Sequence, residues 1–300
     1  MEFLSYLISG ISLGSVYAII ALGYTMVYGI AKMLNFAHGD VIMIGGYISF
    51  CAMSYMGLPG WVALALAMVV CTVLGIVIEG LAYRPLREAP SLAVLITAIG
   101  VSYLLQNSAL LIWGATPKVF PSLIPATNAA GEPNMIQLFG GQLSISYISL
   151  LTMLCCIVIM IGLTLFTGKT KMGKAMRACS EDKGAAQLMG INVNRTISTT
   201  FAIGSGLAAV AGVLLCSSYP TLMPTTGSMP GIKAFTAAVF GGIGSIPGAF
   251  LGGILLGIIE ALAKAYISTQ LSNSIVFAVL IVVLLVRPAG LLGKYVPEKV

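Results

Sequence analysis

The chain has 300 residues, of which 58% are hydrophobic and 8% are charged. Soluble globular domains carry about 25% charged residues, so this composition excludes a soluble protein and indicates one that lies in a membrane. The formal net charge of +6 does not indicate nucleic acid as a partner. The cations lie between apolar runs, where the orientation signals of membrane proteins are found.

Nine apolar runs follow one another along the chain. Each membrane span needs roughly 20 residues, so the length allows about 8–10 membrane segments and no separate soluble domain. Backbone groups in lipid must hydrogen-bond internally, and runs of this length cannot close a barrel. We therefore predict an all-α fold, a polytopic transmembrane helix bundle that forms one domain over residues 1–300. The runs are 4–30, 41–56, 61–83, 91–113, 144–167, 196–218, 231–245, 248–267 and 271–287.

The first run is too long for a signal peptide and is expected to stay as a span. The segment "NFAHGD", Asn35 to Asp40, comes directly before the second run. It allows two interpretations. It is either a helix break, with Asn35 or Asp40 capping the next helix, or a plain turn that closes a hairpin. In the first case Asn35, His38 and Asp40 are candidates for a translocation path, because broken helices expose polar ends to substrates.

The third run ends near Glu79, which can reach Arg84 or Arg87 in the following turn. Inside the fourth run lie Gln106 and Asn107. Buried amides at such positions either join helices or line a path, so both residues are further candidates for the path.

Charge predicts the sidedness of the connections. The loop 114–143 is rich in Pro, Asn and Gly, with only Lys118 and Glu132 charged, and should face outward. The segments 84–90, 168–195 and 288–300 carry most of the cations and should be cytoplasmic by the positive-inside rule.

The segment 168–195 carries eight of the chain's charges in 28 residues. Its composition predicts a helix over about 172–189, which Gly190 would end. Ala185 and Ala186 are small enough to let this helix sit in a groove of another protein. The alternative is a solvated loop whose charges only set the topology.

The seventh run is short for a span and is a candidate for a broken or re-entrant helix. A glycine-rich stretch, "FGGIGSIPGAFLGGILLG", follows from Phe240 to Gly257. Small residues four apart let helix backbones approach closely, and Glu260 can pair with Lys264 one turn later. The glycines expected to pack helices are Gly244, Gly248 and Gly252 on one face, and Gly253 and Gly257 on another.

No enzyme motif survives inspection. "GKT" at 168–170 resembles the end of a P-loop, but Leu163 stands where the motif needs its first glycine. His38 is the single histidine, so there is neither a zinc site nor a GxSxG-type triad. The six cysteines form no CxxC pair and are expected to act as small hydrophobic residues. We predict no catalytic residues, no metal and no cofactor bound by this chain.

Three blocks carry a resemblance to a known family: "ALGYTMVYGIAKMLNFAHGD", "RACSEDKGAAQLMGINVNRTI" and "VFGGIGSIPGAFLGGILLGIIE". They resemble the permease subunits of bacterial branched-chain amino acid ABC importers, most closely the H-type subunit of the leucine/isoleucine/valine system. The resemblance covers nearly the whole chain. It implies a multi-pass protein of the bacterial inner membrane.

The resemblance also implies partners. These are a second, M-type permease, two ATP-binding cassette subunits that use the ATP, and an extracytoplasmic amino-acid-binding protein, with membrane lipid around the bundle. The segment 168–195 would hold the coupling helix that docks on an ATPase. In its EAA-like pattern Ala185, Ala186 and Gly190 fit, whereas Gly184 replaces the Glu. The residues implied in coupling are Arg177, Glu181, Asp182, Ala185, Ala186 and Gly190.

Two other functions stay open from the sequence. Permeases for urea and short amides share this architecture. A self-contained secondary transporter would need buried charges for ion coupling, for which only Glu79, Lys233 and Glu260 are candidates.

Overall fold

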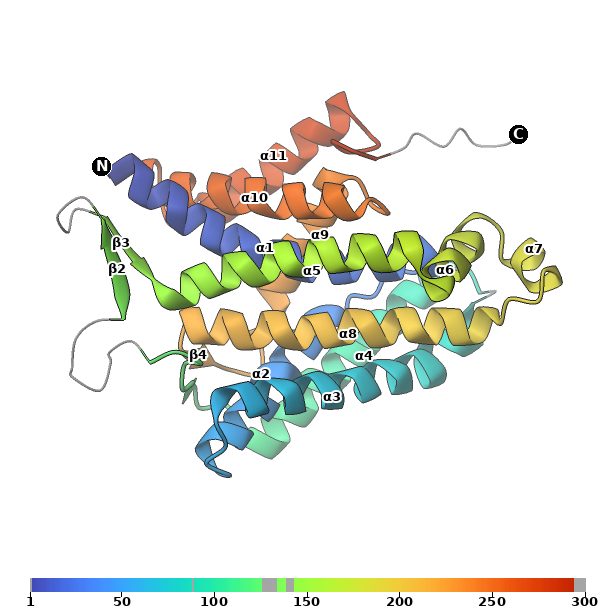
Figure 1. Ribbon diagram of the computed structural model, residues 1–300, viewed down its shortest axis with the longest axis horizontal. Helices are drawn as coiled ribbons and strands as arrows, with labels where there is room; N and C mark the ends of the chain where they lie inside the picture. The colour runs from blue at the N-terminus through green and yellow to red at the C-terminus, as the bar shows by residue number, and fades with distance from the viewer. Residues whose placement is uncertain (1, 88, 126–133, 139–142, 294–300) are drawn as a thin grey trace.

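The computed structural model describes residues 2–87, 89–125, 134–138 and 143–293. It is a bundle of long helices (Figure 1), as predicted. Six helical segments are long and apolar enough to cross a membrane. They are α1 (Glu2–Ala31), α3 with its continuation (Gly60–Leu86), α4 (Ser91–Trp113), α5 (Tyr147–Lys169), α8 (Val193–Ser218) and α10 (Ile246–Tyr266).

Shorter helices complete the bundle. α2 (His38–Ser54), α9 (Ser228–Gly241) and α11 (Ser272–Val286) form at the three remaining apolar runs, so each predicted run becomes a helix. The helix α3 proper ends at Ile78 and continues as a π-helical segment, η1 (Glu79–Tyr83), and a 3-10 turn, η2 (Arg84–Leu86). Two polar helices, α6 (Lys171–Glu181) and α7 (Lys183–Leu188), join α5 to α8.

Two small antiparallel ladders lie at one end of the bundle. β1 (Lys118–Val119) pairs with β4 (Thr221–Leu222), with Lys118 opposite Leu222. β2 (Met135–Leu138) pairs with β3 (Leu143–Ser146), with Met135 opposite Ser146. Parts of the predicted outer loop, 126–133 and 139–142, lie outside the described residues.

The bundle therefore has two distinct ends. At the α7 end lie Ala31, Arg87, Lys183 and Asn194, which hydrogen-bond one another in pairs. At the strand end lie the two ladders and the start of α1 (Figure 1). Of the segments predicted to be cytoplasmic, 168–195 and the described residues 84–87 of the turn 84–90 thus share one end, and the described strands of the loop predicted to be outside lie at the other.

Single-cysteine labelling tests which end faces the cytoplasm. In a background without the six native cysteines, Val119→Cys at the strand end and Lys174→Cys on α6 both place a thiol on an exposed position. An impermeant maleimide applied to intact cells should label position 119 and leave position 174 unlabelled until the membrane is opened. The reverse pattern would show that the chain is inserted the other way up.

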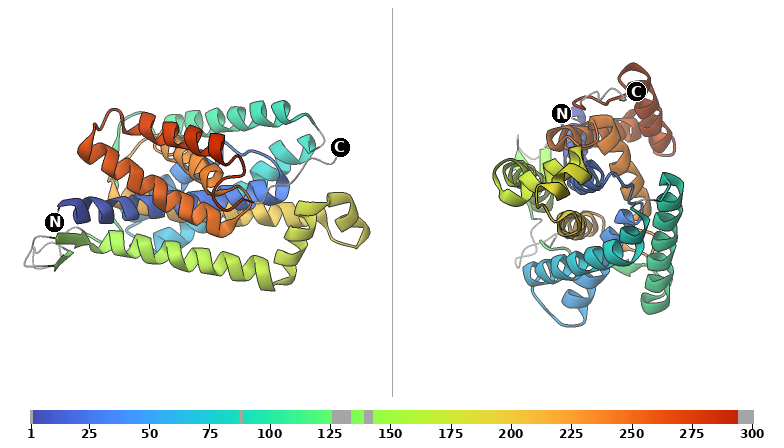
Figure 2. Two further views of the ribbon diagram at one scale, coloured as in Figure 1. Left: turned by 90° about the horizontal axis from the view of Figure 1, so that it is seen from above. Right: turned by 90° about the vertical axis from the view of Figure 1, so that its right-hand side faces the viewer.

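Two four-helix units, α1–α4 and α8–α11, have the same arrangement in opposite orientations. α1 packs along α10 and α3 along α8, while α1 crosses α8 and α2 meets α9. α1 and α3 run toward the α7 end, whereas α10 is antiparallel to α1, since Gly257 faces Gly14 and Gly253 faces Ala18. Viewed from the α7 end, α3 and α4 lie on one side of the α1–α8 centre and α10 and α11 on the other (Figure 2). Inverted repeats of this kind are common in transporters.

A constant offset of 181 positions relates side-chain contacts in the two units. Tyr17 of α1 donates a hydrogen bond of 2.9 Å to Glu260 of α10, and Ser198 of α8 donates one of 2.5 Å to Glu79. Gly23 and Gly204 have the same offset, and they face each other where α1 crosses α8. Glu79 and Glu260 are therefore counterparts in the repeat.

Two of the short helices begin inside the bundle. Residues 32–37 leave the end of α1 without helical structure and return into the bundle, where α2 starts at His38. The ring of His38 lies 4.6 Å from that of Tyr24, which is seven residues, or about 10 Å of helix, before Ala31. The "NFAHGD" segment is thus a helix break and not a turn at the end of a hairpin. In the second unit, α9 likewise starts inside the bundle, as the short seventh run suggests.

The helix caps differ from the prediction. Neither Asn35 nor Asp40 caps α2, whose N-cap is Ala37 without a side-chain hydrogen bond. The reason is that both side chains are engaged elsewhere: Asn35 accepts a hydrogen bond from Tyr83, and Asp40 accepts one from Gln106.

Candidate functional site

The polar segment between α5 and α8 forms two helices, whereas the sequence predicted one. α6 begins at the cap Thr170, whose hydroxyl accepts from Gly173 N–H at 3.0 Å. Asp182 then leaves the helical region, with φ −151° and ψ 113°, and its carboxylate caps α7 by accepting from Ala185 N–H. The single helix over 172–189 was therefore a wrong prediction, because an aspartate competes with the helix backbone for its N–H groups.

The short helix α7 has an exposed apolar face. Leu188 is 90% exposed and Met189, its C-cap, is 83% exposed, and Ala185 is exposed beside them. Ala186 is only 4% exposed and packs into the chain itself. Of the two alanines expected to face a partner, only Ala185 is exposed. Leu188 and Met189 were missed by the sequence reasoning.

The remaining residues implied in coupling occupy different roles. Arg177 donates a 2.8 Å hydrogen bond to the carbonyl of Gly168, near the end of α5. Glu181 is exposed at the end of α6. Gly190 has φ 82°, a left-handed conformation that favours glycine, and turns the chain from α7 toward α8. These positions build the segment, and none of them lies on the exposed face of α7.

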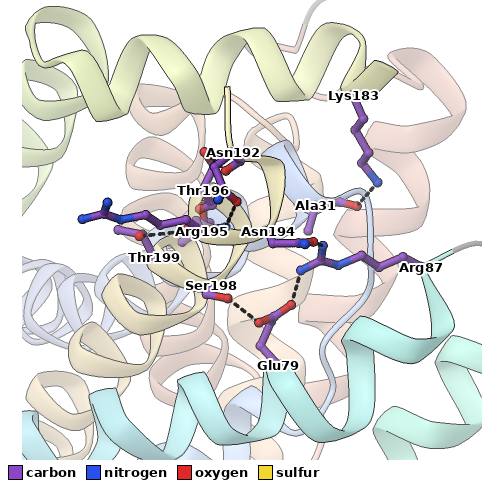
Figure 3. A network of polar contacts seen from close by, with 11 residues as sticks. Ala31, Glu79, Arg87, Lys183, Asn192, Asn194, Arg195, Thr196, Ser198 and Thr199 are labelled. Atoms are coloured by element: carbon purple, nitrogen blue, oxygen red, sulfur yellow. Dashed lines mark hydrogen bonds and ion pairs between the residues drawn. The ribbon is translucent and has the colours of Figure 1, made fainter. Parts of the chain in front are cut away.

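Polar contacts tie this segment to the helices of both units (Figure 3). Lys183 donates a 3.1 Å hydrogen bond to the carbonyl of Ala31, the last residue of α1, where a cation stabilises a helix C-terminus. Arg87 forms an ion pair with Glu79 and also donates to the Asn194 side chain in the first turn of α8. Of the two arginines that Glu79 could reach from the sequence, it pairs with Arg87.

An open hollow of about 660 Å³ lies between α7 and the α3–α4 turn. Burial and the neighbouring Arg87 guanidinium lower the pKa of Lys183 from its usual range. Three cationic side chains, Arg84, Arg87 and Lys183, line this hollow beside the exposed face of α7. Its lining residues are Arg84, Pro85, Arg87, Lys183, Gln187, Gly190, Ile191, Asn192, Val193 and Asn194.

A second polar cluster lies where the half-helices α2 and α9 begin. The amide nitrogen of Gln106 donates to Asp40, at 2.9 Å, and lies 3.3 Å from the hydroxyl of Ser228. Gln106 thus joins the first turn of α2 to the first residue of α9. It is the sixteenth residue of α4, about 22 Å from the start of that helix, so the cluster lies well inside the bundle.

Small residues let the two half-helices approach each other at this cluster. A Cβ atom on Gly39 would lie 2.7 Å from the carbonyl oxygen of Gly227, and one on Gly231 would lie 2.8 Å from the Cα of Gly39. We call the group Asp40, Gln106 and Ser228 the meeting point. It brings together two of the predicted path residues, Asp40 and Gln106, that are far apart in the sequence.

The other predicted path residues lie elsewhere. His38 is 1% exposed and lies between Tyr24 and the crossing of Gly23 with Gly204, and its Nε2 has no hydrogen-bond partner within the described residues. Asn35 is held by Tyr83 at 2.8 Å. Asn107 is exposed and donates to the carbonyl of Tyr103 on its own helix, and among the described residues it has no side-chain hydrogen bond to another helix.

The predicted glycines divide between two helix contacts, and one of them lies outside the helix. Gly244 precedes α10 and has φ 94°, so it was wrongly placed on a helix face with Gly248 and Gly252. Gly248 and Gly252 pack against α9 at Gly241 and Ala237. The glycines Gly253 and Gly257 pack against α1, as described above.

Buried charge surrounds Glu260. Its carboxylate pairs with Lys264 at 2.6 Å, as the spacing predicts, and also with Lys233 at 2.7 Å. All six cysteines are free, and within the described ranges no cluster of three His, Cys, Asp or Glu side chains could hold a metal. Glu260 and Lys233 thus form a buried ion pair, and Lys264 joins it from an exposed position.

One protein family matches this sequence over most of its length. The sequence model described as "Branched-chain amino acid transport system / permease component" matches residues 6–285. The chain belongs to this family.

Individual members of the family cover the chain from end to end. The high-affinity branched-chain amino acid transport system permease protein BraD of Pseudomonas aeruginosa is 46% identical over 307 residues, covering 100% of this chain and 98% of BraD. LivH of Escherichia coli K12, with the same description, is 47% identical over 308 residues with the same coverage. A permease of the autoinducer 2 import system, LsrD of Salmonella paratyphi B, is 29% identical over 231 residues, covering 73% of this chain and 66% of LsrD. The long apolar helices and these relatives identify a multi-pass inner-membrane protein.

Proposed function

We propose that the chain is the H-type permease of an ATP-driven importer of branched-chain amino acids. It would form the translocation path with a second, M-type permease, and would be served by two ATP-binding cassette subunits and an extracytoplasmic binding protein. The observation that carries the proposal is the identity of 46–47% along the full length with BraD and LivH, whose descriptions name branched-chain amino acid transport. The relative described for another cargo, LsrD, is much more distant.

The geometry supports a division of labour between this chain and its partners. The exposed Leu188 and Met189 offer α7 as the docking element for an ATPase, with the cationic hollow beside it for acidic groups at the rim of the groove. ATP would bind and be hydrolysed in the partner subunits, and this chain would contribute no catalytic residue and no cofactor. Residues 1–300 would act as a single membrane domain, whose coupling segment is 168–195.

The translocation path is proposed at the meeting point and on the adjoining face of α4. Asp40, Gln106 and Ser228 supply polar groups inside the bundle. Asn107 and Tyr103 are exposed along the same helix. A polar amide that faces lipid is unfavourable, so this face suits a second permease or a water-filled path. Alternating access would result when a movement of α7 shifts the half-helices.

Reconstitution tests the function and the cargo. Proteoliposomes that hold both permeases and both ATPases should take up leucine only under two conditions. ATP must be present on the side of the membrane where the ATPases lie, and the binding protein must be present on the opposite side. Uptake that follows a proton or sodium gradient without ATP would place the chain among secondary transporters. Uptake of urea or a short amide in place of leucine would keep the mechanism and reject the proposed substrate.

A further inference from the structure

The π-helical segment η1 makes side-chain contacts at both of its ends. At its start, Glu79 is 1% exposed and accepts hydrogen bonds from Ser198 and Arg87. At its end, Tyr83 is fully buried and donates a 2.8 Å hydrogen bond to the side-chain oxygen of Asn35. π-Helical turns are rare in proteins and frequently lie at functional sites.

The first end of η1 connects to the coupling segment. Arg87, which pairs with Glu79, also donates to Asn194 in the first turn of α8 (Figure 3). Asn194 follows α7 after the turn at Gly190, whose φ is 82°. Asn194 and Arg87 thus link the chain after α7 to Glu79, and Ser198 of α8 contacts the same carboxylate.

The second end of η1 connects to the start of a half-helix. Asn35, which Tyr83 holds, lies in the non-helical segment 32–37, three residues before α2 begins at His38. In the first turn of α2, Asp40 accepts the hydrogen bond of Gln106 at the meeting point. The position of Tyr83 thus helps to fix where α2 starts relative to the meeting point.

The counterpart in the second unit lacks these connections. Glu260 is bonded by Tyr17, Lys233 and Lys264, and none of these three residues belongs to the segment 168–195 or to residues 32–37. At the position equivalent to Tyr83 the second unit has Lys264. Within the described residues, only the first unit has both connections. Its buried Glu79 is linked through Arg87 to the coupling segment, and its Tyr83 contacts the segment before α2.

We propose that η1 transmits the movement of α7 to the start of α2, with Glu79 and Tyr83 as positioning residues at its two ends. The proposal rests on the proposed function, because it requires an ATPase to displace α7. When α7 moves, Arg87 carries η1 with it, and Asn35 follows Tyr83. The half-helix α2 then shifts relative to Gln106, and the meeting point changes its shape.

A pair of tyrosine variants tests this transmission. Tyr83→Phe and Tyr17→Phe each delete one buried hydroxyl that donates to a polar side chain, at 2.8 and 2.9 Å, but only Tyr83 belongs to η1. The readout is the distance between spin labels in the assembled complex, with and without ATP. One label pair reports α7 (Gln187→Cys with Leu92→Cys), and the other reports α2 (Tyr55→Cys with Tyr266→Cys).

In the otherwise native complex both label pairs should change their distance on ATP binding. With Tyr83→Phe the ATP-induced change in the α7 distance should remain, while that in the α2 distance should fall about fivefold. Fivefold is about the factor by which one ordinary hydrogen bond changes an equilibrium constant. With Tyr17→Phe both responses should remain. Glu79→Gln, which keeps the side-chain volume, should act like Tyr83→Phe and gives a second test if either variant assembles poorly.

The possible failures are distinguishable. An α2 response that is undiminished in both Tyr83→Phe and Glu79→Gln overturns the transmission through η1. An equal loss in Tyr17→Phe also overturns it, since any buried hydroxyl would then have the same effect. If the α7 pair does not respond to ATP even without these variants, the proposed coupling to an ATPase is itself wrong. None of these readouts depends on which substrate is transported.

Discussion

Replacing Leu188 and Met189 together by aspartate should abolish docking of the ATPase subunits while the membrane bundle stays folded. Both side chains are almost fully exposed in the isolated chain, so the change leaves its own core intact. Burying two such side chains in a partner contributes about 3–6 kcal/mol. We therefore expect the affinity of the chain for the ATPases to fall by at least about 100-fold. The ATPases should then no longer co-purify with the chain, and transport should be lost.

The control for this variant is the exchange Leu188→Met with Met189→Leu, which keeps the apolar face and should retain docking. Co-purification of the ATPases at the original level with both aspartates present would show that α7 is a solvated loop. A tryptophan at Ala186 would be a poor test, because that side chain packs into the chain itself and a bulky residue there disturbs the fold.

Gly257→Ala should destabilise the bundle far more than the same change at Gly162. A Cβ atom on Gly257 would overlap the backbone of Gly14, so α10 would have to move away from α1 along their longest contact. Overpacking of this kind costs about 1–3 kcal/mol, and here the obstacle is backbone and not a flexible side chain. The thermal midpoint of the purified chain in detergent should fall by several degrees.

Gly162 is a matched control, because it lies in the middle of α5 and a Cβ atom there meets nothing within 4 Å. Gly162→Ala should leave the thermal midpoint unchanged or raise it slightly, since alanine favours a helix over glycine by up to about 1 kcal/mol. Equal midpoints for the two variants would mean that the α1–α10 contact does not need glycine.

The spans were predictable because hydropathy alone defines them. The predicted run 91–113 coincides with α4 at both ends. Strong apolar runs bounded by charged or Pro-rich connections leave little choice to a chain in lipid. The same reasoning fails in the polar segment, where α6 and α7 are separated by the cap Asp182. The sequence does contain that signal, an aspartate three residues before Ala185.

The candidate site was only partly predictable. Asp40 and Gln106 could be singled out as polar residues next to or within apolar runs, but no local pattern shows that they meet, or that Ser228 joins them from 122 positions away. The exposed face of α7 was missed for another reason. In a helix of six residues, periodicity cannot decide whether Ala186 or Leu188 faces the chain.

The internal repeat left a trace in the sequence that hydropathy does not reveal. "IEGLA" at 78–82 and "IEALA" at 259–263 differ at one position and carry the counterparts Glu79 and Glu260. A five-residue match is weak evidence of a repeat by itself. Here it is supported by the structure, because Tyr17 and Ser198, which are also 181 positions apart, donate hydrogen bonds to Glu260 and Glu79.

Since the two units share one fold and point in opposite directions, nothing in that shared fold can tell the insertion machinery which way up to place either copy. The signal that sets the membrane orientation must therefore lie in residues that differ between the two units. Arg84 and Arg87 follow the buried glutamate of the first unit, and the equivalent positions after Glu260 are Ala265 and Ser268. By the positive-inside rule we expect the two arginines to mark the cytoplasmic side of the membrane at the end of α3. Arg87 has a second role, because it also contacts Glu79 and the Asn194 side chain at the start of α8.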